Sequence, residues 1–342
     1  MFKKYLFILF IITGLYPVNK IYTEHFNMFN IKNIDSYTVE VDISIGELIF
    51  NPISLNDKNY TELSIYNSYP STLVGFPNLP MLNQIIEIPR ESSIRLEIVQ
   101  DDIEVYDMAD YNINNLIVPV QLSEPKSGPK NNFVMNEDIY ETNLFFKNEF
   151  IQIIEKGLIR EVNIANLMIS PIEYNPIENQ IILHKNIKFR IHFDGANIEL
   201  TNEKKIKTYS PYFEPIFYNS ISNYTPPSLT ETRENDFIED VISYIIIADQ
   251  SFANSLNSFV DWKTQKGFDV TVAYTNQIGS SANAIKNYLQ DQYNNPNGAV
   301  PTFVLLVGDT PQIPASYSSG GHVSDLDYCD YTNDNLPDVL CG

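Results

Sequence analysis

The sequence predicts a protein of two unlike parts: an all-β, sandwich-like domain, followed by part of an α/β domain with a parallel sheet. Three observations carry this prediction. The chain has 342 residues, which exceeds the roughly 250 at which a single hydrophobic core stops growing. Short segments of alternating polar and apolar residues dominate from residue 39 to residue 194. From residue 241 onward, continuous apolar segments alternate with segments of helical spacing.

The first part consists of predicted strands separated by Asn, Asp, Pro and Ser. Period-two alternation runs through residues 37–45 and again through residues 94–99. The segment IILHKNIKFRIHFDG predicts two strands around a turn at residues 184–186. His184 and His192 have no Asp, Cys or third His at ligand spacing, so we interpret both as surface or cross-strand residues. An all-β sandwich is the simplest architecture for this pattern.

The composition changes between Thr208 and Asp240, where Tyr, Pro, Ser and Asn predominate and Pro226 and Pro227 are adjacent. Such a composition is typical of a linker, and we predict one over residues 208–240. Arg233 lies in the charged end of this segment, and exposed linkers are preferred sites of proteolysis. We therefore predict that Arg233 is a processing site.

The second part begins with an apolar segment from Val241 to Ala248 that is rich in Ile and predicts a strand buried on both faces. Asp249 and Ser251 can accept hydrogen bonds from free amides at the start of a following helix, which Gly267 ends.

Two more strands and one more helix follow. FDVTVAY is the second predicted strand, ANAIKNYLQDQY is a helix capped by Ser280 or Ser281, and TFVLLVGD is the third strand. Strands that alternate with helices in this order imply right-handed crossovers and a parallel sheet with helices on its faces.

The third strand ends at Gly308 and Asp309, where open α/β sheets place their ligand sites. Two interpretations of this pair are open. Asp309 belongs to a functional site, or Gly308 turns the chain and Asp309 caps the next turn.

The amino terminus has the pattern of an export signal. Met1 to Lys4 form a short cationic segment, and Tyr5 to Leu15 form an apolar segment of the length of a signal-peptide core. The alternative is a membrane anchor, but the apolar segment is shorter than the roughly 20 residues that a spanning helix needs. We predict a signal peptide over residues 1–23 and a secreted or cell-surface protein without a membrane span.

The net charge is −21, and the 22 Lys and Arg residues are scattered. Nucleic-acid binding requires a clustered cationic face, so this composition argues against a nucleic-acid partner.

Several segments resemble the gingipain-type cysteine peptidases, family C25, whose fold is caspase-like. The helix with Asp261-Trp262-Lys263, the strand ending in Val307-Gly308-Asp309 and the turn at Ser324-Asp325 occur in the order and spacing of that peptidase domain. GFPNLPMLNQIIEIPRESSIRLEIV resembles the propeptide that precedes it. The resemblance implies a propeptide domain over 24–207 and the amino-terminal part of a peptidase domain over 241–342.

The family resemblance implies an exported zymogen that cleaves polypeptides and whose propeptide keeps its own peptidase domain latent. Its catalytic His lies in a G-H-G turn and its catalytic Cys ends a later strand; both are expected beyond Gly342. His322, Cys329 and Cys341 do not correspond to them. We therefore expect this chain as given to be inactive, and we interpret its DVLCG end as a strand cut short in a fragment. The two cysteines either form a disulfide or are small half-buried residues.

Aspartates crowd the end of the chain, and alternating Asp and Asn suit the six to eight oxygen ligands of Ca²⁺. The resemblance implies a structural calcium ligand at Asp309. Spacing alone suggests Asp330, Asn333, Asp334 and Asp338, although DYTNDNLPD lacks the glycine and glutamate of an EF-hand loop. The alternative for these four is a turn in which Asn and Asp side chains bind their own backbone.

Two further functions stay open. One is the sortase-like member of the same family that trims carboxyl-terminal signals during type IX secretion. The other is a non-catalytic secreted binding or adhesion protein. A G-H-G motif and a strand-ending Cys in a longer reading frame would favour the enzyme.

Overall fold

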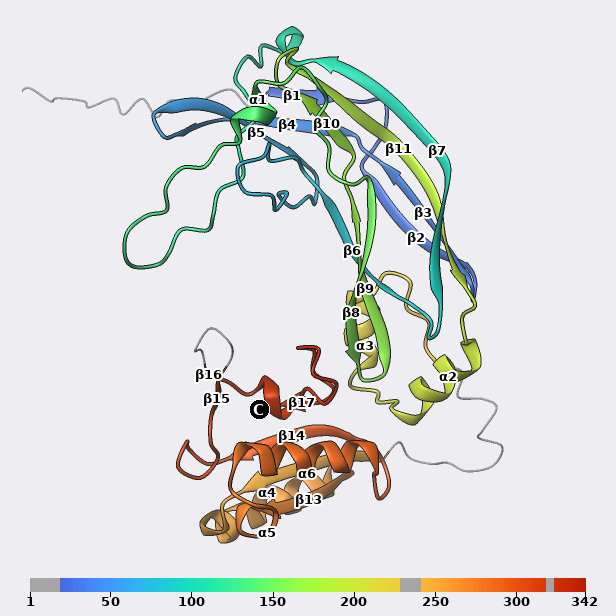
Figure 1. The fold of residues 1–342 in the computed structure, drawn as a ribbon. Helices are drawn as coiled ribbons and strands as arrows, with labels where there is room; N and C mark the ends of the chain where they lie inside the picture. Colours follow the sequence, from blue (N-terminus) through green and yellow to red (C-terminus); the bar gives the residue numbers. More distant parts are fainter. Residues whose placement is uncertain (1–18, 228–240, 318–322) are drawn as a thin grey trace, which may run out of the picture.

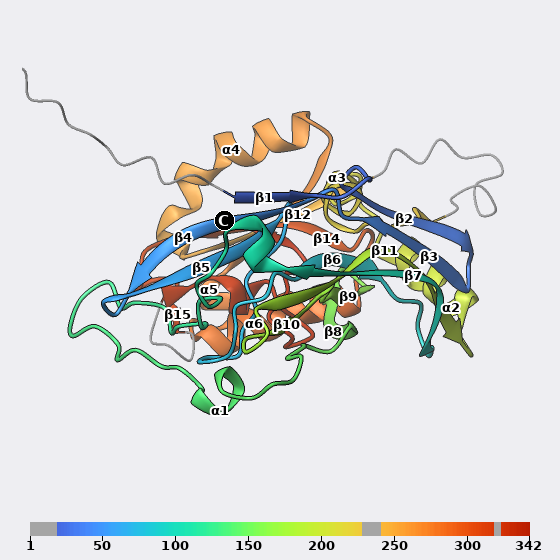
Figure 2. The ribbon, with the colours of Figure 1, turned by 90° about the horizontal axis from the view of Figure 1, so that it is seen from above.

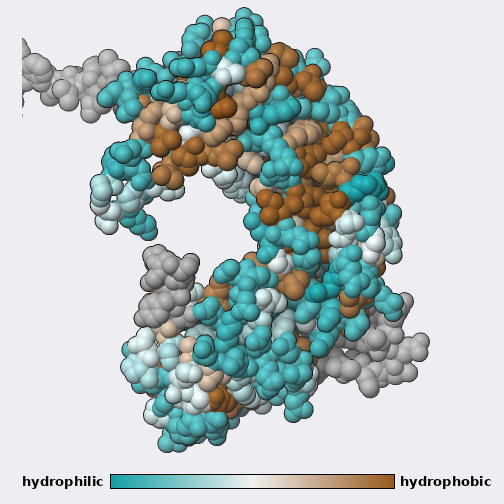
Figure 3. Space-filling model, in the orientation of Figure 1, coloured by the Kyte–Doolittle hydropathy of each residue, from teal (hydrophilic) through white to brown (hydrophobic). Residues whose placement is uncertain are grey.

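The protein is described by a computed structural model that covers residues 19–227, 241–317 and 323–342. Figure 1 shows an arched, β-rich half above a smaller α/β half, with the hairpin of β8 (Ile151–Ile159) and β9 (Val162–Ile169) reaching from the first to the second. The predicted fold class, a β-sandwich-like domain followed by a parallel α/β domain, is confirmed. Figure 3 shows a wide hollow between the two halves beside the hairpin contact.

The β-rich half contains three sheets with antiparallel pairing, in the orders β1-β4-β5, β10-β11-β3-β2 with β7 on β11, and β6-β9-β8. Its strands are β1 (Asn19–Tyr22), β2 (Met28–Asp35), β3 (Thr38–Ser44), β4 (Glu47–Leu55), β5 (Lys58–Ile65), β6 (Leu82–Glu87), β7 (Ser93–Asp107), β8 (Ile151–Ile159), β9 (Val162–Ile169), β10 (Ile172–Asn175) and β11 (Gln180–Asp194).

One hydrophobic core joins these three sheets. Alternate residues of β3, namely Val39, Val41 and Ile43, are buried in it, as the period-two pattern predicts. Phe50 of β4 and Leu167 of β9 belong to the same core. The inward faces of the sheets therefore form a common interior, which is the packing of a sandwich.

The predicted turn at residues 184–186 is wrong, because β11 is one continuous strand across it. The pairing of β11 with β7 shifts register between His184 and Asn186, so the polar residues mark a bulge in place of a turn. His184 is buried against the ring of Phe150, and its Nδ1 lies 2.7 Å from a carboxylate oxygen of Asp101. His192 Nε2 lies 2.8 Å from Glu97 Oε2, across the same strand pair.

The predicted signal peptide over residues 1–23 overlaps the first described strand. Residues 1–18 lie outside the described part, but Asn19–Tyr22 form β1, which pairs with β4. Ile21 is buried in the core of the β-rich half. Removal of residues 1–23 would take away this core strand. The signal peptide itself stays a prediction.

Short helices lie at the edges of the β-rich half and after its last strand. They are a 3-10 helix at Met108–Tyr111 (η1), α1 (Glu137–Tyr140), α2 (Ile198–Lys207) and α3 (Glu214–Ser220). Asn197 caps α2 by accepting a hydrogen bond from the amide of Leu200.

The predicted linker over 208–240 is wrong in its first part. Phe213, Phe217 and Ile221 are buried with Val162 and Ile164 of β9. Aromatic side chains at helical spacing, embedded among Pro, Ser and Asn, pack α3 onto the sheet. The segment before residue 228 therefore belongs to the β-rich half, and Arg233 lies outside the described residues.

The α/β half contains a parallel sheet in the order β13-β12-β14-β17. Its elements are β12 (Ile242–Ala248), a 3-10 helix at Gln250–Phe252 (η2), α4 (Ala253–Gln265), β13 (Phe268–Tyr274), α5 (Thr275–Ile278), α6 (Ala282–Asn294), β14 (Pro301–Val307), β15 (Ser316–Tyr317), β16 (Val323–Ser324), a 3-10 helix at Leu326–Tyr328 (η3) and β17 (Leu340–Cys341).

Helices cover both faces of this sheet, which explains the apolar strands. Leu256 of α4 packs with Tyr244, Ile246 and Ala248 on one face, and Ile285 and Leu289 of α6 pack with Ile245 and Ile247 on the other. Seen from above in Figure 2, α4 and α6 lie on opposite sides of the strands.

The predicted boundaries of α4 and α6 hold closely. The predicted cap of α4 is displaced: Asp249 accepts a hydrogen bond from the amide of Ser251 and so caps η2, whereas Phe252 precedes α4 without a side-chain cap bond. Gly267 follows the end of α4 with a φ of 90°. Ser281 caps α6 through the amide of Ala284 at 3.2 Å. Within the described residues, no helix is long and apolar enough to cross a membrane.

Candidate functional site

The carboxyl edge of the parallel sheet is the first candidate site. The central strand β12 has β13 on one side and β14 on the other, so the strand order reverses there. Ligands of open α/β sheets bind where the order reverses, at the carboxyl ends of the strands. Asp249 follows β12, Thr275 follows β13, and Gly308 and Asp309 follow β14.

The two aspartates at this edge hold local turns. The Asp249 carboxylate accepts hydrogen bonds from the Ser251 hydroxyl at 2.6 Å and the Ser251 amide at 2.9 Å, and these bonds hold the pKa of Asp249 below its usual value. The Thr275 hydroxyl adds a third bond at 3.4 Å. The Asp309 carboxylate accepts from the amide of Thr310 at 2.7 Å.

Gly308 has a φ of 152°, and a Cβ built there would lie 2.8 Å from the Cβ of Gln312. The carbonyl of Asp309 accepts from the amides of Gln312 and Ile313, at 2.8 and 2.9 Å. These contacts agree with the alternative in which Gly308 turns the chain and Asp309 caps the next turn. A ligand role for Asp309 stays a prediction.

The other four predicted calcium residues lie at the opposite end of the sheet. Asp338 accepts a hydrogen bond from the amide of Arg160, and the guanidinium of Arg160 donates to the carbonyl of Pro301 at the start of β14. Asp309 follows the other end of that strand. Seven strand residues span about 20 Å. Asp330, Asn333, Asp334 and Asp338 are therefore neighbours of one another but not of Asp309.

Three of these side chains, Asp330, Asp334 and Asp338, accept hydrogen bonds from backbone amides, and Asn333 accepts one from a lysine side chain. Asp330 accepts from the amides of Asn333 at 2.6 Å and Asn335 at 3.0 Å. Asp338 accepts from the amide of Tyr331 at 2.9 Å, and Asn333 Oδ1 accepts from Lys286 Nζ at 3.0 Å. Within residues 19–227, 241–317 and 323–342, no three His, Cys, Asp or Glu residues group as metal ligands would. As arranged here, the four residues do not fit a calcium site.

Asp338 is fully buried, and its pKa is raised to about 6. Burial is the main cause, since it disfavours the charged carboxylate. Hydrogen bonds from the amides of Tyr331 and Arg160 lower this pKa, and the charges of Asp334 and Asp330 raise it.

Cys329 and Cys341 are free thiols in this structure, Cys329 buried and Cys341 half-buried. Cys329 Sγ lies 3.4 Å from the carbonyl oxygen of Asp325. A hydrogen bond with Cys341, together with burial, raises the pKa of the Cys329 thiol. A buried thiol with a raised pKa is a poor nucleophile. His322 lies outside the described residues.

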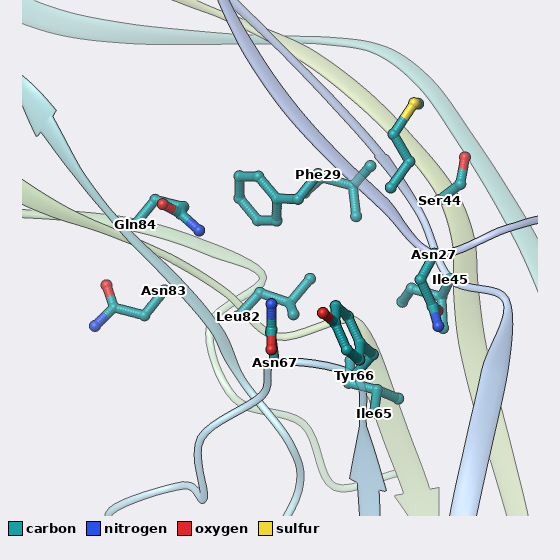
Figure 4. Close-up of a pocket in the computed structure, with 12 residues that line it drawn as sticks. Asn27, Phe29, Ser44, Ile45, Ile65, Tyr66, Asn67, Leu82, Asn83 and Gln84 are labelled. Carbon is teal, nitrogen blue, oxygen red and sulfur yellow. The ribbon is translucent and has the colours of Figure 1, made fainter. Parts of the chain in front are cut away.

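A cavity of about 260 Å³ opens in the β-rich half, between the ends of β2 and β3, the residues after β5 and the start of β6. Figure 4 shows Phe29, Tyr66 and Leu82 beside several amide side chains there. Asn83 Oδ1 is buried and has no hydrogen-bond partner in the part of the chain that the structure describes. The lining also carries the hydroxyls of Ser44 and Tyr66, but among the described residues it has no His, Asp, Glu, Lys or Cys that could activate them.

The contact between the two halves depends on a residue that the sequence did not indicate. Arg160, at the tip of the β8–β9 hairpin, is 1% exposed and reaches the start of β14. Arg160 and Glu161 have φ values of 48° and 69°. Two-residue turns with positive φ favour Asn-Gly or Asp-Gly, so Arg-Glu gives no turn signal. Arginine is also rarely buried, so no pattern marked it.

Apolar packing extends this contact. Leu336 and Leu340 of the α/β half pack against the cluster of Val162, Ile164 and Phe213. The ring of Tyr212 lies 4.9 Å from that of Phe303, edge to face.

Comparisons with known proteins identify the family. The C25 propeptide model matches residues 33–218, which is more than half of the 342 residues, and the model of peptidase family C25 matches residues 238–342. Lys-gingipain of Porphyromonas gingivalis is 28% identical over 307 residues, which cover 88% of this chain and 18% of that protein. Gingipain R2 of Porphyromonas gingivalis is 26% identical over 256 residues, which cover 72% of this chain and 32% of that protein.

A solved structure that addresses the zymogenic latency of gingipain K from Porphyromonas gingivalis aligns with a TM-score of 0.50 and 25% identity. The alignment covers 53% of this chain and 100% of that one. The chain thus spans less than a fifth of the length of the Lys-gingipain that it matches. The chain belongs to the gingipain-type peptidases of family C25, with a C25 propeptide followed by sequence of the peptidase domain.

Proposed function

We propose that the protein to which this chain belongs is an exported cysteine endopeptidase made as a latent precursor. The observation that carries this proposal is the order of the two family matches, propeptide and then peptidase, in one chain whose halves are in contact. The alignments with Lys-gingipain and gingipain R2 cover 88% and 72% of this chain, more than either family match covers alone.

The reaction proposed is hydrolysis of peptide bonds in polypeptides. In this chemistry a thiolate attacks the scissile carbonyl, and a histidine sets the charge of the thiol and protonates the departing amine. The α/β half contributes the parallel sheet whose carboxyl edge would carry these groups. Cys329 is excluded from this role by its burial and its raised pKa.

Latency is proposed to end with a cut between the two halves. The family matches leave residues 219–237 between them, and Arg233 lies in that interval. Amino-terminal sequencing of the mature secreted protein tests this assignment. We expect a new terminus at Glu234, and termini found elsewhere would remove Arg233 as the processing site.

The activity is tested with the full reading frame taken from genomic DNA. The precursor is purified with and without a thiol-blocking reagent, and hydrolysis of a fluorescent casein is followed before and after cleavage between the halves. We expect hydrolysis after cleavage that the blocking reagent abolishes. A cleaved protein with no such hydrolysis would contradict the peptidase function and favour a secreted binding protein.

Export is a separate proposal that rests on the cationic and apolar residues before Asn19. Expression with its own leader in a host with a secretion pathway tests it. We expect extracellular protein whose amino terminus lies at or before Asn19. Retention of an uncleaved chain inside the cells would contradict export.

A further inference from the structure

The tip of the β8–β9 hairpin is an unusual turn. Ile159 pairs with Val162, so Arg160 and Glu161 form a two-residue loop in which both residues have positive φ. A side chain makes this backbone conformation costly, and it persists where surrounding contacts hold it. The comparable β4–β5 hairpin uses Asn56 and Asp57, which suit positive φ, and its tip is exposed.

The guanidinium of Arg160 is fully bonded, mostly to the other half. An arginine side chain has five N–H donors, and the structure gives all five an acceptor. The acceptors are the carbonyls of Thr208 at 2.5 Å, Pro301 at 2.6 Å, Asp338 at 3.2 Å and Val300 at 3.2 Å, and the hydroxyl of Thr302 at 3.3 Å.

The backbone of the tip is fixed in the same contact. The amide of Arg160 donates to Asp338 Oδ1 at 3.2 Å, and its carbonyl accepts from the Thr208 hydroxyl at 2.9 Å. The amide of Leu158 donates to Asp334 Oδ2 at 2.6 Å. Asp334 and Asp338, which were predicted as calcium ligands, therefore accept hydrogen bonds from backbone amides of the propeptide hairpin.

The geometry of this contact fits an arginine side chain better than a lysine side chain. A planar guanidinium can reach several carbonyls at once, whereas a lysine ammonium has three donors at a single point. The guanidinium also lies 5.0 Å from the centre of the Phe213 ring, within range of a cation–π interaction. Burial lowers the pKa of Arg160 to about 10, so the side chain is still a cation at neutral pH.

The contact lies at the amino-terminal edge of the parallel sheet. Val300, Pro301 and Thr302 stand at the start of β14, and Asp309 follows its other end. The hairpin tip thus holds the α/β half about 20 Å from the carboxyl edge. Binding of the propeptide here does not depend on contacts at that edge.

We propose that Arg160 is the anchor through which the propeptide stays bound to the peptidase half as a separate chain after the connection is cut. This rests on the proposed zymogen function, since it concerns how latency ends. Cutting the connection leaves the bonds of Arg160 in place, so release of the propeptide is a second step that breaks them.

The test uses the full chain with a recognition sequence for a site-specific protease placed within residues 228–240. After cutting, size-exclusion chromatography of the cut chain at a series of dilutions shows whether the halves stay together and gives their Kd. We expect the cut wild-type halves to elute together. Arg160→Ala should raise the Kd at least about 30-fold, since a buried arginine is removed from the centre of the contact, and Arg160→Lys at least about 10-fold.

The matched control is Arg95→Ala, which removes an exposed arginine that pairs with Asp194 within the propeptide. It should leave the Kd within about 2-fold of the wild type. Cut wild-type halves that separate at once, or Arg160→Ala halves that bind as tightly as the wild type, would overturn the proposal.

A milder variant covers the case in which Arg160→Ala does not fold, which circular dichroism of the uncut chain reveals. Thr302→Val removes one acceptor of the guanidinium from the α/β side and should raise the Kd about 3-fold to 10-fold. An unchanged Kd would count against the anchor. These measurements need no peptidase activity, so an active enzyme whose cut halves separate freely would refute the anchor and leave the proposed function standing.

Discussion

Replacing Lys205 by Met tests why the segment after α2 folds onto the propeptide. Lys205 Nζ lies 2.6 Å from Glu87 Oε1, and the exposed fractions of the two side chains are 4% and 9%. Lys205 also donates to the carbonyl of Thr225, and its ammonium lies 4.5 Å from the Tyr224 ring. One buried cation thus joins α2, β6 and the residues before the proposed cut.

The expected loss of stability in Lys205→Met follows from the burial of the Lys205–Glu87 pair. Removing one partner leaves a buried charge without compensation, which typically costs about 3–5 kcal/mol of unfolding free energy. For a domain of this size, 1 kcal/mol lowers Tm by about 2–4 °C, so Lys205→Met should lower Tm by about 6–20 °C. Burial already raises the pKa of Glu87, so Glu87 in the variant takes up a proton more readily. The loss should therefore be smaller at acidic pH than at pH 7.

The assay is urea unfolding of the full chain. Far-ultraviolet circular dichroism follows the β-rich half, and fluorescence of Trp262, the single tryptophan, follows the α/β half. The control is Lys147→Met, because Lys147 pairs with Glu173 while 64% exposed and should contribute less than about 1 kcal/mol. Equal losses in the two variants would refute the reasoning about the buried pair.

Three further outcomes follow from the same structure. Gly157→Ala should destabilise the hairpin tip by about 2–4 kcal/mol in thermal unfolding, because the new Cβ would clash with the Asp334 carboxylate. The control is Gly298→Ala, where φ is also positive but the Cβ would meet open space. An equal loss of stability in the control would contradict the clash. The raised pKa of Asp338, about 6 against an ordinary 3.8, means that its stabilising contribution is complete below pH 4 and is lost as the pH rises through 6. The stability of wild type relative to Asp338→Asn should therefore fall by about 2–4 kcal/mol between pH 4 and 7 in urea titrations, and a constant difference would count against a buried, protonated carboxyl. If Asp309 binds calcium, the ion should raise the Tm of the full chain, and chelator or Asp309→Ala should remove the rise; no shift with calcium would end the calcium proposal.

Much of the α/β half could be predicted from the sequence because its local signals agree. Ile-rich strands, the cap at Ser281 and the stop at Gly267 each specify one element, and a parallel sheet is the arrangement that joins them. The strand order β13-β12-β14-β17 was not predicted, because the alternation of strands and helices does not specify which strands are neighbours.

The β-rich half was predictable in class but not in detail. The polar residues at 184–186 are typical of a turn. In the structure β11 continues through them, and its pairing with β7 shifts register there and forms a bulge. The segment around α3 looks like a linker because Pro and Ser surround its aromatic residues. Burial of Phe213 and Phe217 against β9 overrides that composition.

The contact between the halves was beyond the reach of sequence patterns. It depends on Arg160 meeting backbone carbonyls that lie about 140 positions further along the chain. Carbonyls have no sequence signature, since every residue carries one. The aspartates at 334 and 338 stood out as oxygen ligands, but the groups that they accept from are amides of the hairpin.

Hydrogen exchange of the intact chain tests most directly whether the propeptide binds the peptidase half through the β8–β9 hairpin. The amides of Leu158 and Arg160 donate across the contact, to Asp334 and Asp338. We expect both amides to be protected far more strongly than those at the exposed tip of Asn56 and Asp57, and to stay protected after a cut within residues 228–240. Exchange at 158–160 as fast as at 56–57, before or after the cut, would contradict the account.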